Sequence, residues 1–193
     1  RVARELKRRF ERDVALMFTD VVGSTAYFER HGDAAGRALV QRHLDLLEAA
    51  LAKHNGVIND TAGYGSFCRF DSASDGALAL IELMSTIRED NASVSEDKQL
   101  RVRCGLHWAR ALVDDDTVTG EAVNYSARIA SSAEPGEIRI SEAAYRHLPP
   151  ELRLRCRSVP PVMFKGYDDP ALLMVLHWRD PSDSPSALRI EET

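Results

Sequence analysis

The segment Phe18–Thr25 places an acidic side chain beside a glycine turn. Asp20 follows a short apolar run, and Gly23, Ser24 and Thr25 then open the next element. A Mg²⁺–triphosphate complex needs both features, because carboxylate oxygens bind the metal and free backbone N–H groups at a helix N-terminus bind phosphate. The same segment also suits an ordinary strand–turn–helix corner in which Ser24 or Thr25 caps the helix.

A second polar pair lies on a helix that we expect at about Glu121–Ala133. Asn124 and Arg128 are four residues apart, which places both on one face of that helix, as two groups that contact one ligand require. A solvated polar face is the alternative interpretation of this spacing.

The elements that must position these residues follow from the hydrophobic pattern. Val14–Phe18 is an unbroken apolar run, typical of a strand covered on both faces. A long helix begins at Asp33, another near Ser72, and a short one follows Ser141. Further strands are expected at Gly56–Asp60, Ser66–Phe70, Leu100–His107, Ala111–Asp114, Glu137–Ile140, Leu152–Arg157, Val162–Lys165 and Leu172–Leu176. Helices interleaved with strand pairs predict an α+β fold with a sheet on one side and helices on the other.

Composition limits the class of protein. A chain of 193 residues with 44% hydrophobic content suits one domain with tails. Its net charge of −5 does not suggest a nucleic-acid partner, and no apolar run is long enough to span a membrane. The three widely spaced cysteines indicate free thiols in a reducing cytoplasm rather than a disulfide framework or a zinc site.

The expected organisation has three parts. Residues 1–13 form a linker helix, 14–178 one domain, and 179–193 a disordered tail rich in Ser, Pro and charge. The charged run Arg1–Arg12 either enters from an upstream sensor domain or is simply a solvated helix. Because the first residue is Arg1 rather than Met, we expect a piece of a larger protein.

Five motifs, in order along the chain, resemble those of class III adenylate and guanylate cyclase catalytic domains, the cyclase homology domain. They are Phe18–Thr25, Gly105–His107, Gly120–Arg128, Pro135–Ser141 and Phe164–Gly166, and the resemblance runs from Val14 to about Trp178. It implies a divergent bacterial-type member with a ferredoxin-like βαββαβ core and extra strands and helices. It also implies a head-to-tail dimer with active sites at the interface, which converts a nucleoside triphosphate to the 3′,5′-cyclic monophosphate and pyrophosphate.

The resemblance also implies roles for single residues. Asp20 would be the first of two metal-ligating aspartates, next to phosphate-binding residues Gly23, Ser24 and Thr25. The other protomer would supply the base-reading residues, together with Asn124 to orient the ribose and Arg128 to neutralise charge on the α-phosphate. Lys165 would contact the terminal phosphates. The ion would be Mg²⁺ or Mn²⁺ if the domain is active, and none is expected otherwise.

The turn that carries the second aspartate in this family departs from its pattern. The family has Gly-Asp-Gly, whereas this chain has Gly63-Tyr64-Gly65. A phenol with a pKa near ~10 is a poor Mg²⁺ ligand at neutral pH. Moving the ligand role to Asp60 would displace it by roughly 13 Å along a strand, at ~3.3 Å per residue, so we discount that alignment. Asp71, at the far end of the next strand, is no better placed.

The base-reading positions also differ. Asp60 replaces the adenine-reading lysine, and a carboxylate accepts hydrogen bonds from guanine but cannot donate one to adenine. The partner position is Thr117, a residue type found in many bacterial adenylate cyclases. Ala109-Arg110 replaces the Gly-Glu that usually follows the Gly-x-His strand.

Three hypotheses follow. The first is a degenerate cyclase domain with weak or no activity that acts as a dimerising or nucleotide-binding regulatory module. The second is an active cyclase with altered metal use and base preference, GTP included, and the third is a purely structural domain between sensor and output. A homodimer carries the Tyr64 defect in both sites, whereas a heterodimer with an intact cyclase domain would keep one working site.

Overall fold

A single mixed sheet forms the centre of the protein. The computed structural model describes residues 2–61, 63, 65–115 and 117–180. The strands follow the order β2-β3-β1-β4-β6-β8-β7, and β5 pairs with β4 outside this path. Their bounds are β1 Glu11–Val21, β2 Val57–Asp60, β3 Gly65–Phe70, β4 Val102–Asp114, β5 Thr117–Thr119, β6 Ile138–Ser141, β7 Cys156–Ser158 and β8 Leu173–Leu176.

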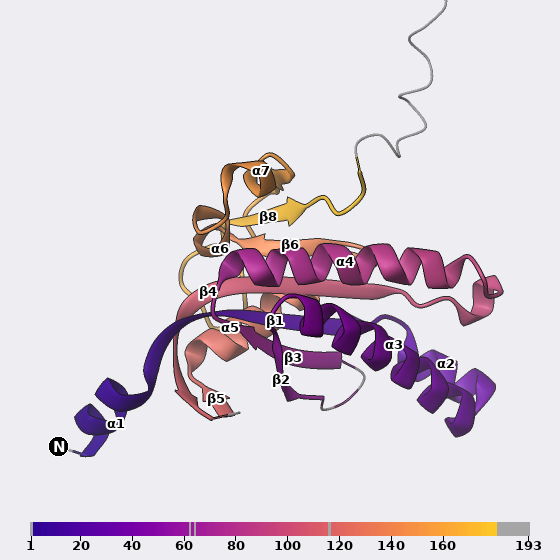
Figure 1. The fold of residues 1–193 in the computed structure, drawn as a ribbon, viewed down its shortest axis with the longest axis horizontal. Coiled ribbons are helices and arrows are strands. Elements are labelled where there is room, and N and C mark those ends of the chain that lie inside the picture. Colours follow the sequence, from indigo (N-terminus) through magenta and orange to yellow (C-terminus); the bar gives the residue numbers. More distant parts are fainter. Residues whose placement is uncertain (1, 62, 64, 116, 181–193) are drawn as a thin grey trace, which may run out of the picture.

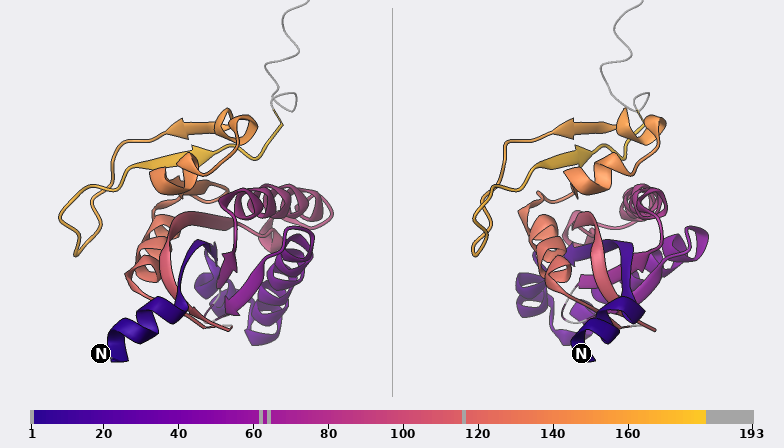
Figure 2. Two further views of the ribbon diagram at one scale, coloured as in Figure 1. Left: turned by 60° about the vertical axis from the view of Figure 1, so that its left-hand side comes forward. Right: turned by 90° about the vertical axis from the view of Figure 1, so that its left-hand side faces the viewer.

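The helices lie on both faces of this sheet (Figures 1 and 2). Their bounds are α1 Val2–Phe10, α2 Ser24–His31, α3 Asp33–Lys53, α4 Ala73–Asn91, a 3₁₀ turn Glu96–Lys98, α5 Glu121–Ser132, α6 Glu142–Arg146 and α7 Pro150–Arg153. Within the described residues, no helix is long and apolar enough to cross a membrane.

The predicted ferredoxin-like core is confirmed. Strands β2, β3, β1 and β4 are neighbours in that order, and each adjacent pair is antiparallel. Helices α2 and α3 connect β1 to β2, and α4 connects β3 to β4, which completes the βαββαβ order. The extra strands extend the sheet beyond β4, where β6 pairs with β4 in parallel.

The helices lie on both faces of the sheet, whereas the sequence predicted helices on one side only. Ala15 and Met17 of β1 pack in the core formed with α3 and α4, whereas Val14 and Leu16 pack in a second cluster that includes Val123 of α5. Because β1 is apolar on both faces, burying both requires a helix on each side. The helix α5 therefore forms a third layer, visible opposite α4 in Figure 2.

Several boundaries also differ from the sequence-based expectation. The strands predicted at Leu100–His107 and Ala111–Asp114 are one strand, β4, which pairs with β1 from Val102 to Leu112. The strand predicted at Leu152–Arg157 is largely replaced by α7 and the short β7, and that at Val162–Lys165 is a single bridge from Val162 to Ala171. The helix expected near Ser72 is confirmed, since the Asp75 backbone N–H donates to Ser72 Oγ at 3.0 Å.

We predict that Gly105 in β4 permits the close approach of α5. A Cβ built at Gly105 would lie 2.4 Å from the backbone N of Ala130 and 2.8 Å from its Cα. Gly105→Ala should therefore lower the free energy of unfolding by about 1–3 kcal/mol, measured by urea denaturation followed by circular dichroism. Gly76→Ala is the matched control, because its Cβ would meet the flexible end of Leu106 and alanine favours the helix. Equal losses in the two variants would contradict this role.

Candidate functional site

Asp20 lies at the penultimate position of β1, on the α5 side of the sheet. It is paired in register with Arg103 of β4 and with Gly65 of β3. The Arg103 Nε and Nη2 atoms donate to Asp20 Oδ2 at 2.8 and 2.7 Å, and Nη1 donates to the Ser131 carbonyl oxygen of α5 at 3.0 Å. Sequence analysis missed Arg103, because only the strand register places it against a residue 83 positions away.

A cavity of about 310 Å³ opens beside this ion pair. Both Asp20 and Asp60 border it, although they come from β1 and from β2. The sheet register explains this, because Asp60 pairs with Phe67, Phe67 pairs with Phe18, and the two phenylalanine rings stack at 4.6 Å. The structure thus brings two of the predicted site carboxylates to one cavity.

The described carboxylates suit one divalent cation better than two. Mg²⁺ is commonly held by one or two carboxylates together with substrate phosphates, and Asp20 is partly exposed beside the cavity. Both Arg103 contacts use the same oxygen, Oδ2 of Asp20. Within the described ranges no group of three or more His, Cys, Asp or Glu side chains forms a metal cluster. Tyr64, at the second metal position, lies outside the described residues.

The turn after β1 leaves helix N–H groups without a side-chain cap. The N-cap of α2 is Gly23, with φ of 74°, and no side chain accepts a hydrogen bond there. The alternative in which Ser24 or Thr25 caps this helix is therefore wrong. The turn is held by the Val22 N–H, which donates to the Arg101 carbonyl oxygen at 2.7 Å.

Asn124 and Arg128 lie together on the exposed side of α5, as their spacing predicts. Neither borders the Asp20 cavity, which α5 lines with Ala127, Ala130 and Ser131 instead. Thr117, the first residue of β5, is also exposed and lies four residues before the start of α5. Within one chain, the described structure therefore separates the metal-ligand candidate Asp20 from the ribose and phosphate candidates.

Lys165 is carried by a long arm between β7 and β8 that packs on α5. The rings of Phe164 and Tyr167 meet Tyr125 edge-on, at centroid distances of 5.4 and 5.2 Å. Tyr125 is the residue after Asn124, so the aromatic contacts fix the arm to the helix that carries Asn124 and Arg128. Lys165 itself is exposed.

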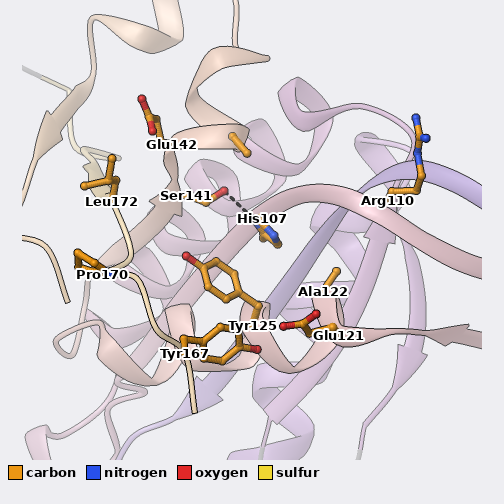
Figure 3. Close-up of a pocket in the computed structure, with 11 residues that line it drawn as sticks. His107, Arg110, Glu121, Ala122, Tyr125, Ser141, Glu142, Tyr167, Pro170 and Leu172 are labelled. Carbon is orange, nitrogen blue, oxygen red and sulfur yellow. Dashed lines mark hydrogen bonds between the residues drawn. The ribbon is translucent and has the colours of Figure 1, made fainter. Parts of the chain in front are cut away.

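A cavity of about 610 Å³ lies beneath this arm, and Figure 3 shows its lining. His107 lies at its base, where Nδ1 is 2.7 Å from Ser141 Oγ and the imidazole stands 4.8 Å from the Tyr125 ring. Burial lowers the pKa of His107 to about 4, so the imidazole is neutral at physiological pH. The Ser141 hydroxyl also accepts from the Ala144 N–H and caps α6. These contacts tie His107 to the packing of the arm.

The family of the chain follows from a comparison of its sequence. A model of the adenylate and guanylate cyclase catalytic domain matches residues 6–177. The chain belongs to this family. One relative, provisionally named adenylate cyclase 3, from Rhizobium meliloti (strain 1021), is 28% identical over 76% of this chain and 25% of its own length. The cyclase domain thus spans about a quarter of that relative.

Solved cyclase structures share the fold. An adenylate/guanylate cyclase/hydrolase from Silicibacter pomeroyi superposes with a TM-score of 0.77 at 21% identity, covering 86% of this chain and 96% of that one. A guanylyl cyclase domain of the RhoGC fusion protein from Blastocladiella emersonii, described as a non-canonical dimer, gives 0.70 at 17% identity, with coverages of 86% and 97%. At these identities the likeness establishes the cyclase fold.

We predict that His43 makes the cyclase domain less stable in acid. This imidazole is fully buried under β1, with Nε2 3.1 Å from Thr19 Oγ1, and its Nδ1 has no hydrogen-bond partner within the described part of the chain. Burial lowers its pKa from 6.5 to about 4, against an opposing effect of Asp20. The unfolded chain therefore binds the extra proton, and stability that is complete above pH 6.5 is lost as the pH falls toward 4.

Protonation of His43 should lower the free energy of unfolding of the parent chain by on the order of 3 kcal/mol as the pH falls. We expect His43→Asn to lack this loss. Urea denaturation at a series of pH values between 7.5 and 4.5 measures this slope, which separates titration from any fixed cost of the substitution. The exposed His177→Asn variant is the control and should keep the slope of the parent chain. An unchanged slope in His43→Asn would show that another group causes the acid sensitivity.

Proposed function

We propose that this cyclase domain is degenerate, with weak or no cyclase activity, and acts as a dimerising or nucleotide-binding regulatory module. The observation that carries the proposal concerns the two positions at which this family binds its metal ions. Asp20 is held by Arg103, and the second metal position is Tyr64. Losing one of two metal ligands removes much of the charge that stabilises the transferring phosphoryl group.

The remaining residues still suit nucleotide binding. Asp20 would hold one Mg²⁺ or Mn²⁺, and a bound ion would supply positive charge to the triphosphate. The uncapped N–H groups after Gly23 would bind phosphate oxygens, and the Arg103 guanidinium adds a fixed positive charge near the same cavity. Asn124 would position the ribose and Arg128 the α-phosphate, with Lys165 at the terminal phosphates.

A dimer would be needed to assemble these groups. Asn124 and Arg128 are exposed and lie apart from the Asp20 cavity of their own chain. A head-to-tail homodimer would present them to a nucleotide held by the partner's Asp20. A heterodimer with an intact cyclase domain would present them to a nucleotide held by both aspartates of that domain. This arrangement supports a role in which the chain completes or regulates the site of another protomer.

An active cyclase with altered metal use and a guanine preference is the second candidate. One observation favours it: Asp60 is an exposed carboxylate at the position of the adenine-reading lysine, on the chain that also carries Asn124 and Arg128. A carboxylate at this position accepts hydrogen bonds from the N1 and N2 hydrogens of guanine, while it opposes the ring-nitrogen acceptor of adenine.

We predict little or no cyclic product from ATP with Mg²⁺. Cyclic nucleotide formation from ATP and GTP, with Mg²⁺ or Mn²⁺, should stay well below a turnover of roughly 1 s⁻¹, the low end for ordinary enzymes. Tyr64→Asp combined with Asp60→Lys should raise the rate with ATP, because it restores a carboxylate and an adenine donor. A parent rate of about 1 s⁻¹ or more would refute the degenerate assignment.

A complementation experiment with a second cyclase domain distinguishes a regulatory role of this chain from a purely structural one. The chain is mixed with an active cyclase domain whose own Asn–Arg pair has been replaced, so that only a mixed dimer has a complete site. We expect activity to appear, and to disappear with Asn124→Ala or Arg128→Ala in this chain. Arg157→Ala, on an exposed position of β7, is the matched control. No activity in any mixture would argue for a structural module.

We predict that Asp60 biases the site toward guanine. Charge-assisted hydrogen bonds of about 1.5–3 kcal/mol correspond to roughly tenfold or greater preference for GTP. Calorimetry with non-hydrolysable GTP and ATP analogues measures it, and Asp60→Asn should reduce the difference. Tighter binding of the ATP analogue, which Thr117 would suit, would show that Asp60 does not read the base.

A further inference from the structure

A separate cavity of about 550 Å³ lies on the α4 side of the sheet. Its apolar lining comes from the C-terminal half of α4 and the start of β4, namely Met84, Ile87, Leu100 and Val102. The chain after β8 closes another side with Trp178, as its course above α4 in Figure 1 illustrates. Because Val102 and Arg103 point to opposite faces of β4, this cavity and the Asp20 cavity lie on opposite sides of the sheet.

The tryptophan is fixed within this cavity. Trp178 Nε1 donates to the Gly136 carbonyl oxygen at 2.9 Å, and so anchors on the Pro135-Gly136 turn that the sequence motifs single out. The guanidinium carbons of Arg88 and Arg179 lie 5.9 and 5.1 Å from the centre of its ring. The indole therefore offers a held aromatic surface with cations around it.

Among the described residues, the charged groups that border the cavity are all basic. They are Arg88, Arg101 and Arg179, and no described Asp or Glu belongs to the lining. Arg88 and Asp180 each have a polar, ring or electrostatic partner as well. Two further carboxylates pair with other arginines, Asp90 with Arg42 at 2.8 Å and Glu137 with Arg139 at 3.1 Å. Glu96 reaches Arg101 only at 3.9 Å, in an exposed contact that contributes little. On a chain of net charge −5, three arginines thus line one cavity.

We propose that this cavity binds a small organic anion. The apolar or aromatic body of the ligand lies against Trp178 and the apolar lining, and its phosphate or carboxylate is bound by the arginines. Two sources share this chemistry, a nucleoside monophosphate and a fatty acid, and the volume accommodates either. The proposal does not depend on the cyclase chemistry, because none of these residues belongs to the proposed nucleotide site.

A backbone hydrogen bond connects this cavity to the turn at Gly23 that would bind phosphate. The carbonyl of Arg101 accepts the Val22 N–H at 2.7 Å, one residue before Gly23. A ligand that shifts Arg101 therefore acts on the turn that follows Asp20. The cavity is thus placed to act as an effector site on the face away from the substrate.

Trp178 fluorescence reports binding directly. The chain has two tryptophans, so Trp108→Phe leaves Trp178 as the single tryptophan, which is excited selectively over the tyrosines. This variant is titrated with adenosine monophosphate and, separately, with decanoate. A second form that ends at Asp180 is titrated in parallel, because the residues after it include Asp183, Glu191 and Glu192, which are candidate internal anions.

We expect a saturable fluorescence change with at least one probe, in at least one of the two forms. Arg88→Gln with Arg179→Gln, or Arg101→Gln alone, should weaken that binding about tenfold or more, as expected for a lost charged hydrogen bond. Arg157→Gln is the matched control and should bind as the parent does. Circular dichroism checks that each variant is folded.

The identity of the probe that binds distinguishes a nucleotide from a fatty-acid ligand, and binding only after truncation identifies residues 181–193 as a competitor for the cavity. Absence of a saturable change with both probes in both forms would overturn the proposal. So would affinity that survives all three arginine changes, or adenosine monophosphate binding that Asn124→Ala and Arg128→Ala abolish, since the probe would then occupy the cyclase site.

Discussion

The antiparallel pairing of β1 with β4 determines where every other part of this cyclase domain can lie. All eleven residues of β1 are paired, from Glu11 with Leu112 to Val21 with Val102. This register places Arg103 opposite Asp20 and Gly105 opposite Phe18. The first pairing puts a guanidinium on the metal-ligand candidate, and the second leaves room for α5 against the sheet. A shift of β4 by one residue would turn the Arg103 side chain to the other face of the sheet.

The consequence at the site is electrostatic. Asp20 and Arg103 are both only partly buried, with side chains 39% and 32% exposed, so their pairing is favourable without a large desolvation cost. The pair also satisfies the carbonyl oxygen of Ser131, which links the sheet to α5. Any cation that binds Asp20 must share its carboxylate with Arg103. Without a cation, the charge of this carboxylate is neutralised by the arginine.

The two faces of the sheet carry different groups of polar residues. On the α5 side lie Asp20, Asp60, Asn124 and Arg128, all suited to a nucleotide and its ion. On the α4 side lie the buried His43 and the arginine-lined cavity around Trp178. The strand β4 and the turn after β1 belong to both sides, and the Val22–Arg101 hydrogen bond joins them.

The sequence alone determined what depends on local spacing. The apolar run ending at Asp20, the Ser72 cap and the shared face of Asn124 and Arg128 follow from periodicity and capping within one element, and the motifs identified the cyclase family. Only the tertiary structure decided what depends on register between distant strands. The Arg103 contact with Asp20, the shared cavity of Asp60 and Asp20, and the unbroken β4 all arise from pairings of residues far apart in the chain. Hydrophobic pattern specifies that a strand is buried on both faces, but it does not specify which residue of a partner strand stands opposite, because that is set by the packing of the whole sheet.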